Sequence, residues 1–448
     1  MMEIILITMI GFISMYAMNC YKYQPSLPTV FSFQSMAKFD RFEVTWIKRF
    51  HISMLESLYY WIFKRELQTG PILFVPDANW SVEISKLDLK MTLNSLKSHS
   101  GFTDESLRLN LEGFKKHQHI VQSIDWKGFR KNAIKQTKVF GIIMEHQLRK
   151  LCNEGKGSVE LDFEKFIYLL FLDIMGKVIA STDVESLQSF STNEFSMSLI
   201  GWNKLKLLLE KRDEVSVFLH YPSELGSGNI NVLNTNAFVR NIFKRGIRNA
   251  APNSLIFQMK SFLNIKPDSE KMEELDIVLE GIDFLSMSMK TIPYVTTKAI
   301  FELARNPKCL KKLQKVLPKS ISDMDDLSSI TYLDNVIKEV LRLHPPITSI
   351  ERQALCDIKI CENIIPSGAL LYISIKHLHT NEKYWKNPME FNPDRWSKLP
   401  IDGSYYPFGF HQCTGEKTSI EQIKIIIYTI FHNFAINCGD ELTTISLQ

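Results

Sequence analysis

The residue in this sequence best suited to metal chemistry is the cysteine at position 413. It lies in an aromatic, glycine-containing loop, Tyr405-Tyr-Pro-Phe-Gly-Phe-His-Gln-Cys-Thr-Gly-Glu416, directly before an amphipathic segment at 416–434. At the N-terminus of a helix, unpaired backbone N–H groups and the positive end of the helix dipole stabilise a thiolate. Thiolate is the form of cysteine that ligates iron, so Cys413 is a candidate metal ligand. Taken alone, however, the pattern fits a cysteine packed in a core better.

An acidic and a basic residue three positions apart form a second pattern. Glu339 and Arg342 fall within a predicted helix at 330–343, where side chains at i and i+3 share a face. On a solvated surface such a pair contributes only about 0.2–0.5 kcal/mol. A third pattern, Phe391-Asn-Pro-Asp-Arg-Trp396, supplies a further arginine, Arg395, before the cysteine loop. The order of these patterns is more informative than any one of them.

A fourth pattern, Trp126-Lys-Gly-Phe-Arg130, places a tryptophan and an arginine about one helical turn apart. The four patterns follow one another in an order that resembles the cytochrome P450 superfamily, over about residues 65 to 435. The resemblance implies a mainly α fold with small β-sheets in a single large domain. It also implies haem b (iron protoporphyrin IX) as the cofactor.

The resemblance assigns roles to the residues that match the family's motifs. Cys413 would be the axial thiolate on the haem iron, which favours O–O cleavage. Trp126 and Arg130 would donate to one haem propionate, and Arg352 would bind the other. His411, two residues before the cysteine, stands where relatives usually carry arginine and can donate one N–H to a carboxylate.

The same resemblance implies that Glu339, Arg342 and Arg395 form a buried ion-pair network that holds the 391–396 segment against the core. Removing one partner of a buried pair typically costs about 3–5 kcal/mol, far more than breaking a surface pair. We therefore expect a structural role for these three residues.

The segment that matches the family's oxygen-handling run, Ala-Gly-x-Asp-Thr-Thr-Ser, departs from it. It reads Glu280-Gly-Ile-Asp-Phe-Leu-Ser286, which keeps Asp283 as a candidate proton donor. Phe284 replaces the threonine that would hydrogen-bond dioxygen, and Glu280 replaces a small residue. The cysteine loop departs as well, because the first glycine of F-G-x-G-x-R-x-C-x-G is missing or two residues are lost.

Phe284 leaves several functions open. If water takes the place of the hydroxyl, the chain is a haem-thiolate monooxygenase that hydroxylates a lipophilic small molecule with O2 and electrons from a redox partner. If the chemistry has changed, it is a reductase-independent peroxide isomerase or dehydratase of the same fold, because such enzymes need no dioxygen. A third alternative is a catalytically degenerate haem-binding protein. The scaffold motifs that are kept favour monooxygenation.

A narrower resemblance indicates the substrate. Gly70-Pro71-Ile72 and the Lys338-Glu339 start of the Glu-x-x-Arg motif look like the animal mitochondrial clan, which includes steroid and ecdysteroid hydroxylases. This resemblance implies a sterol or steroid as substrate. The electron donor would be an adrenodoxin-like ferredoxin or, in a microsomal enzyme, NADPH-cytochrome reductase.

The elements that must position these residues are mostly helices. Apolar periodicity predicts helices at 119–136, 138–152, 160–180, 271–305, 308–317, 330–343 and 413–434. Strand-like runs are few and short: Pro71–Val75, Asp357–Cys361 and Leu370–Ile375. No linker rich in Gly, Ser or Pro divides the chain, so one catalytic domain is expected over 65–448.

The N-terminus predicts a membrane anchor. Ile4–Met18 is uncharged and apolar, slightly shorter than the ~20 residues that cross a bilayer, and is followed by lysines and arginines. We expect an anchor or targeting segment at 1–20 and a proline-containing connector with an amphipathic region at 21–64. The anchor favours the cytoplasmic face of the endoplasmic reticulum, with the mitochondrial inner membrane as the alternative; a cleaved signal peptide is the rival interpretation of the segment.

Composition sets the remaining limits. Of 448 residues, 45% are apolar and 23% are charged, which excludes a disordered chain. Lysine and arginine total 53 against 49 aspartates and glutamates, and this net charge of +4 is too small to indicate nucleic-acid binding. Seven scattered cysteines favour a reducing compartment over a disulfide framework.

Overall fold

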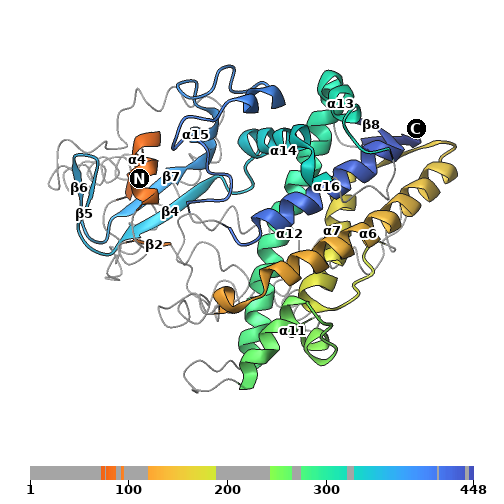
Figure 1. Cartoon of the computed structure of the whole chain (residues 1–448), viewed down its shortest axis with the longest axis horizontal. Helices are drawn as coiled ribbons and strands as arrows, with labels where there is room; N and C mark the ends of the chain where they lie inside the picture. The colour runs from red at the N-terminus through yellow and green to blue at the C-terminus, as the bar shows by residue number, and fades with distance from the viewer. Residues whose placement is uncertain are drawn as a thin grey trace, which may run out of the picture.

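The computed structural model of the chain describes residues 72–75, 77–86, 92–94, 120–187, 243–264, 274–319, 327–410, 413–438 and 443–447 (Figure 1). The expected anchor at 1–20, the connector at 21–64 and His411 lie outside these residues. Across the described ranges, no helix combines the length and the apolar character needed to cross a membrane.

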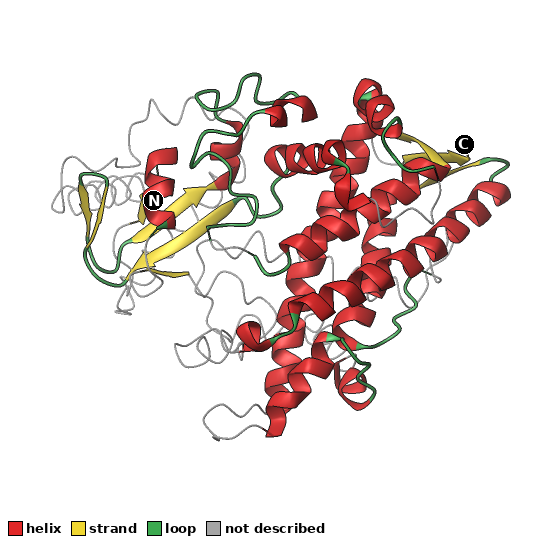
Figure 2. Ribbon diagram, viewed as in Figure 1, coloured by secondary structure: helices red, strands yellow, loops and turns green. Residues whose placement is uncertain are grey.

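Long helices form one side of the molecule (Figure 2). They are α6 (Trp126–Glu154), α7 (Phe163–Ala180), α12 (Glu274–Arg305), α14 (Thr331–Leu343) and α16 (Glu416–Asn433). Shorter helical segments are α4 (Ala78–Ser85), α11 (Leu255–Lys260), η2 (Ser261–Asn264), α13 (Pro307–Gln314), α15 (Ile375–Thr380) and η5 (Pro393–Ser397). The mainly helical fold is thereby confirmed.

The helices expected at 119–136 and 138–152 form, from Trp126 onward, the single helix α6. Thr137, at the expected boundary, is buried, and its Oγ1 donates to the Ala133 carbonyl 2.8 Å away. The hydroxyl is therefore satisfied inside the helix, and the chain continues without a break. Asp125 caps the start of α6 by accepting from the N–H groups of Lys127 and Gly128.

Helix α7 is buried along most of its length and packs against both α6 and α12. Helix α16 packs against α6 and α12, and α14 packs against α12. Trp126 begins α6, and Cys413 lies three positions before Glu416, the first residue of α16. Two helices in contact thus carry two of the predicted haem contacts at their N-terminal ends.

The strands lie mainly at the opposite side. A four-stranded sheet has the order β1-β7-β4-β2, in which only the β1–β7 pair is parallel. A hairpin pairs β5 with β6, and a third sheet has the order β3-β9-β8. The strands are β1 (Ile72–Phe74), β2 (Thr92–Asn94), β3 (Ser158–Leu161), β4 (Ser349–Ala354), β5 (Ile358–Ile360), β6 (Asn363–Ile365), β7 (Leu370–Ser374), β8 (Phe434–Cys438) and β9 (Thr443–Leu447). Strands β1, β5 and β7 confirm the three predicted runs.

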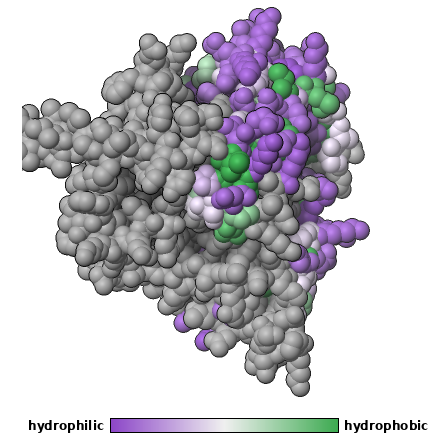
Figure 3. Space-filling model, turned by 90° about the vertical axis from the view of Figure 1, so that its left-hand side faces the viewer, coloured by the Kyte–Doolittle hydropathy of each residue, from purple (hydrophilic) through white to green (hydrophobic). Residues whose placement is uncertain are grey.

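Buried apolar side chains form two groups. The helical core comes mainly from α6, α7, α12, α14 and α16, and the sheet core from α4, α15 and the strands β4 to β7. The cysteine loop contacts both, because Phe408 packs against the helical core while Tyr406 and Phe410 pack against the sheet core. Viewed from the sheet end, most of the described surface is hydrophilic, with small apolar groups between (Figure 3).

Candidate active site

The structure brings Glu339, Arg342 and Arg395 together. Glu339 and Arg342 are fully buried on α14, and Nε and Nη2 of the arginine donate to Oε2 and Oε1 of the glutamate over 3.0 and 2.9 Å. Arg395 Nε donates to Oε1 over 2.8 Å, and Trp396 Nε1 donates to Oε2 over 3.0 Å. The backbone N–H of Asn392 also donates to Oε1. Five donors therefore surround one buried carboxylate, the condition under which a buried charge is tolerated.

Arg342 also binds backbone carbonyls at the end of α15 and in the chain that follows it. Arg342 Nη1 donates to the carbonyl oxygens of His379 and Pro388 over 2.9 and 2.6 Å, and its Nη2 reaches the Glu390 carbonyl over 3.2 Å. The Trp385 ring packs against the guanidinium, with 5.2 Å between the ring centroid and Arg342 Cζ. The ion pair thus anchors the segment leading to η5 at several points.

Cys413 lies at the start of α16 with its side chain exposed. The Glu416 N–H donates to the Cys413 carbonyl over 3.1 Å. Desolvation raises the pKa of the Cys413 thiol, and the nearby backbone N–H groups of Gly415 and Glu416 lower it by a smaller amount. The thiol is therefore protonated at neutral pH unless a cation is bound. A metal ion deprotonates a coordinating thiol outright, and N–H groups near the sulfur would stabilise the resulting metal thiolate.

The loop before the cysteine is fixed by a turn. Gly409 has φ +82°, a left-handed conformation that glycine adopts without strain, and its N–H donates to the Tyr406 carbonyl over 3.2 Å. The rings of Tyr406 and Phe410 meet edge to face at 4.7 Å. Of the two glycines in the loop, Gly409 is therefore the one that shapes the approach to Cys413.

Arg352 faces this loop from β4. It is only 6% exposed, and its guanidinium carbon lies 5.8 Å from the centroid of the Phe410 ring. Burial lowers the pKa of Arg352 to about 10, because desolvation penalises the charged form. A carboxylate bound next to it would offset that penalty. Binding of a haem propionate by Arg352 stays a prediction, and the desolvation of the guanidinium supports it.

Trp126 and Arg130 are engaged by protein groups. Trp126 Nε1 donates to the Val121 carbonyl over 2.8 Å. Arg130 Nε donates to Glu421 Oε2 over 2.9 Å, its Nη2 pairs with Oε1, and these contacts raise the pKa of the arginine. The pair links α6 to α16 and was missed from the sequence, where no pattern connects residues so far apart. Binding of a propionate by Trp126 and Arg130 stays a prediction.

The oxygen-handling run lies on α12. Asp283 is buried, and Phe284 is half-buried, with its ring centroid 5.9 Å from that of Trp126. The Ser288 hydroxyl donates to the Phe284 carbonyl over 2.7 Å, so it is used within the helix. Phe284 therefore joins α12 to α6 through an aromatic contact at the position where the family carries a hydroxyl.

Gly281 lies in the same run, and a Cβ added at this position would lie 2.2 Å from Phe243 Cε1. This glycine is needed because an aromatic side chain packs against the helix there. Glu280 is buried beside it. The substitution of a small residue by glutamate thus falls in the interior of the protein and not on its surface.

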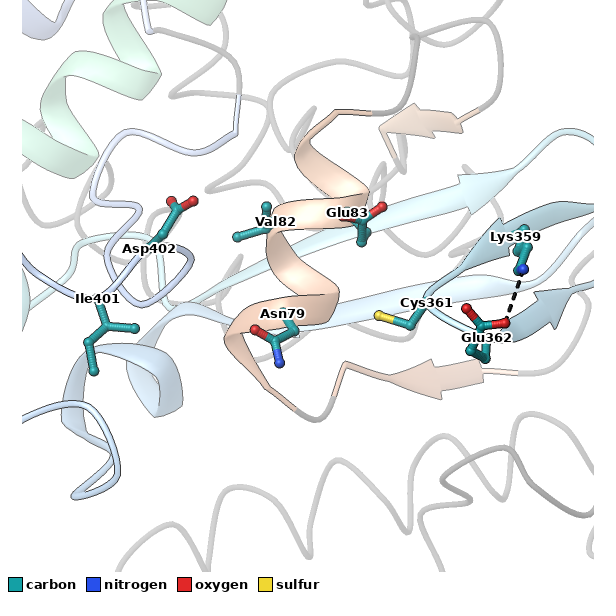
Figure 4. A pocket seen from close by; sticks show the side chains of 8 residues that line it. All are labelled: Asn79, Val82, Glu83, Lys359, Cys361, Glu362, Ile401 and Asp402. Atoms are coloured by element: carbon teal, nitrogen blue, oxygen red, sulfur yellow. Dashed lines mark ion pairs between the residues drawn. The ribbon is translucent and has the colours of Figure 1, made fainter.

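The residues present fit a haem group. They offer an exposed cysteine with two backbone N–H groups near its sulfur and a buried arginine beside the same loop. Cys413 would hold the iron and Arg352 a propionate. A separate pocket of about 640 Å³, between α4, the β5–β6 hairpin and the 401–402 turn, contains none of the predicted site residues (Figure 4). Its lining residues are Asn79, Val82, Glu83, Lys359, Cys361, Glu362, Ile401 and Asp402.

Comparisons with known proteins agree with the motif order. The chain matches the sequence profile of the family described as Cytochrome P450 over residues 128–446. It is 33% identical over 205 residues to Cytochrome P450 71B25 of Arabidopsis thaliana, which covers 43% of this chain and 39% of that protein. It is 33% identical over 193 residues to Cytochrome P450 3A5 of Homo sapiens, covering 39% and 38%. The matches therefore span well under half the length of these relatives.

Proposed function

The chain belongs to the cytochrome P450 family, and from this premise we propose that it is a haem-thiolate monooxygenase that hydroxylates a lipophilic small molecule. The family holds haem b through a cysteine thiolate. One observation carries the proposal: Cys413 lies exposed just before α16, with the backbone N–H groups of Gly415 and Glu416 close enough to lower the pKa of its thiol. The intact network around Glu339 supports it, because this network holds the chain that leads to the cysteine loop.

When bound, haem supplies the redox chemistry with which dioxygen is activated. The residues of this chain then have separate tasks. Cys413 would bind the iron, and the N–H groups of Gly415 and Glu416, which lower the pKa of its thiol, would stabilise the charge on its sulfur. Arg352 would neutralise a propionate, and Asp283, buried on α12, would hold a proton for bound dioxygen. Phe284, in contact with Trp126, would keep its surroundings apolar.

We infer the substrate and the partner from the clan resemblance in the sequence. A sterol or steroid is the leading substrate class, and apolar pockets are the rule for such ligands. Electrons come from NADPH-cytochrome reductase or from an adrenodoxin-like ferredoxin. The apolar segment at 4–18 favours a membrane-bound enzyme on the cytoplasmic face of the endoplasmic reticulum, with the mitochondrial inner membrane as the alternative.

A specific observation favours a second candidate. Phe284 stands where a hydroxyl would assist protonation of dioxygen, and peroxide isomerases and dehydratases of this fold use neither dioxygen nor a reductase. In this alternative, Asp283 and the thiolate act on a substrate that already contains an O–O bond. A protein that binds haem without turnover is the third outcome.

The test begins with the carbon monoxide difference spectrum of the reduced protein. Wild type should show the red-shifted Soret band of a thiolate ligand, Cys413→Ala should lose it, and the matched control Cys361→Ala should keep it. Loss of the band in Cys361→Ala alone would contradict the assignment of the ligand. Spectral titration with a panel of steroids then tests the substrate class, and turnover of a lipid hydroperoxide without reductase would favour the second candidate.

A further inference from the structure

His379 connects the arginine network to the cysteine loop. It lies in α15 with no exposed surface, and its backbone carbonyl accepts from Arg342 Nη1. Its ring nitrogen Nε2 lies 2.9 Å from the backbone nitrogen of Tyr406 and accepts that N–H. Tyr406 precedes Cys413 by only seven residues. One residue thus contacts the Glu-x-x-Arg network with its backbone and the cysteine loop with its side chain.

The ring can accept this hydrogen bond only while it is neutral. Burial lowers the pKa of His379 to about 3, and the positive charges of Arg342 and Lys376 act in the same direction. Because Nε2 accepts, the ring proton is assigned to Nδ1. Nδ1 lies near the carbonyls of Leu341 and Arg342 but makes no hydrogen bond of ordinary geometry. The bond to Tyr406 is therefore the principal polar contact of the ring.

Aromatic side chains reinforce the same junction. The ring of Tyr405 lies 4.9 Å from that of His379, and its hydroxyl donates to the Lys338 carbonyl over 3.1 Å. Trp396, which donates to Glu339, lies 4.6 Å from Tyr405. The start of the cysteine loop is thus packed against the same carboxylate network that His379 contacts.

We propose that His379 is a positioning residue for the iron-binding loop: by accepting the Tyr406 N–H, it sets the position at which the chain enters the turn at Gly409 and reaches Cys413. The turn is anchored on its other side through the Gly409 N–H and Phe410. Tyr406 is the point where both restraints meet, since its N–H is held by His379 and its carbonyl accepts from Gly409. The inference rests on the proposed ligation of haem by Cys413.

Two substitutions of His379 by amide side chains of different length test this proposal. In His379→Gln the side-chain oxygen reaches the position of Nε2 and keeps the acceptor, whereas in His379→Asn the same amide is one methylene shorter. In full-length, haem-loaded protein, the Tyr406 amide should exchange with deuterium at the wild-type rate in His379→Gln. In His379→Asn it should exchange about fivefold faster or more, as expected for loss of one hydrogen bond. The thiolate-type Soret band should likewise be kept by Gln and lose intensity with Asn.

Equal behaviour of the two variants, whether both resemble wild type or both fail, contradicts the proposal, because buried volume alone would then explain the site. A measurement on wild type covers the case in which a variant does not fold. Selective ¹⁵N labelling should show His379 neutral at pH 7 with the proton on Nδ1, and a proton on Nε2 would exclude the bond. Tyr406 exchange reports on His379 even if Cys413→Ala shows that another residue ligates iron.

Discussion

At the scale of single residues, Phe284 is the position that separates the two proposed chemistries. Its ring contacts Trp126, and the hydroxyl of Ser288, about one turn further along α12, donates to the Phe284 carbonyl. Because phenylalanine has no hydroxyl, residue 284 cannot organise a water molecule that carries protons to dioxygen. In a monooxygenase, poor proton delivery diverts reducing equivalents to peroxide.

We expect Phe284→Thr to lower the peroxide released per electron pair consumed, in protein reconstituted with a reductase and a bound substrate. A tenfold gain in the productive rate corresponds to about 1.4 kcal/mol of barrier, within the range of one well-placed proton donor. Asp283→Asn should slow turnover in the wild-type background. If wild type already releases little peroxide per electron pair and Phe284→Thr does not change that amount, this interpretation of Phe284 is contradicted.

The ion-pair network could be predicted from the sequence, and the contact of His379 could not. Glu339, Arg342, Arg395 and Cys413 follow one another in a fixed order of motifs, and the structure brings the first three into one network. His379 had no such signal, because a lone histidine between two helices is usually core packing. Its role depends on a backbone N–H from a loop 27 positions away, which only the fold supplies.

At the scale of elements, long periodic helices were predictable and short polar strands were not. Strand β4, Ser349-Ile-Glu-Arg-Gln-Ala354, carries Arg352 yet has few apolar residues. It forms because it pairs on both sides, with β7 and with β2, so its backbone hydrogen bonds come from partners far away in the chain. Tertiary pairing overrides local propensity there.

The network on α14 should dominate the stability of the helical side. Glu339→Gln removes the charge that Arg342 and Arg395 share and leaves a fully buried guanidinium without its counter-ion. We expect a loss of about 3–5 kcal/mol in the free energy of unfolding, measured by urea denaturation.

The matched control is Glu145→Gln on α6. Glu145 pairs with Arg149, whose side chain is 43% exposed, so solvent screens the interaction. This substitution should cost less than about 1 kcal/mol. Equal losses in the two variants would mean that the buried network contributes no more than a surface pair.

At the scale of the whole molecule, the cysteine loop and His379 lie where the helical core meets the sheet core. Phe408 belongs to one side and Tyr406 and Phe410 to the other. His379, on α15 of the sheet side, accepts the Tyr406 N–H with its ring and a bond from Arg342 of α14 with its carbonyl. Protonation of His379 would therefore disturb the junction of the two cores, and the response of the fold to acid should report on it.

The direction of the change in stability with pH follows from the lowered pKa of His379. The pKa of His379 falls from its ordinary value of 6.5 to about 3 in the folded protein, so below pH 6.5 the unfolded chain binds a proton that the native state excludes. The stability gained is complete above pH 6.5 and is lost progressively as the pH falls toward 3. Linkage gives a loss of roughly 1.4 kcal/mol between about pH 7.5 and 5.5 for this group.

Urea denaturation of the full chain over this pH range measures the loss, and His379→Gln is the control, because glutamine keeps the acceptor but does not titrate. Other groups contribute equally to both proteins, so the difference between their pH slopes isolates His379. We expect the wild-type free energy of unfolding to fall by about 1.4 kcal/mol more than that of the variant. Parallel slopes would mean that His379 already carries a proton in the folded protein or lies open to water, and either result is incompatible with a buried neutral ring that accepts the Tyr406 N–H.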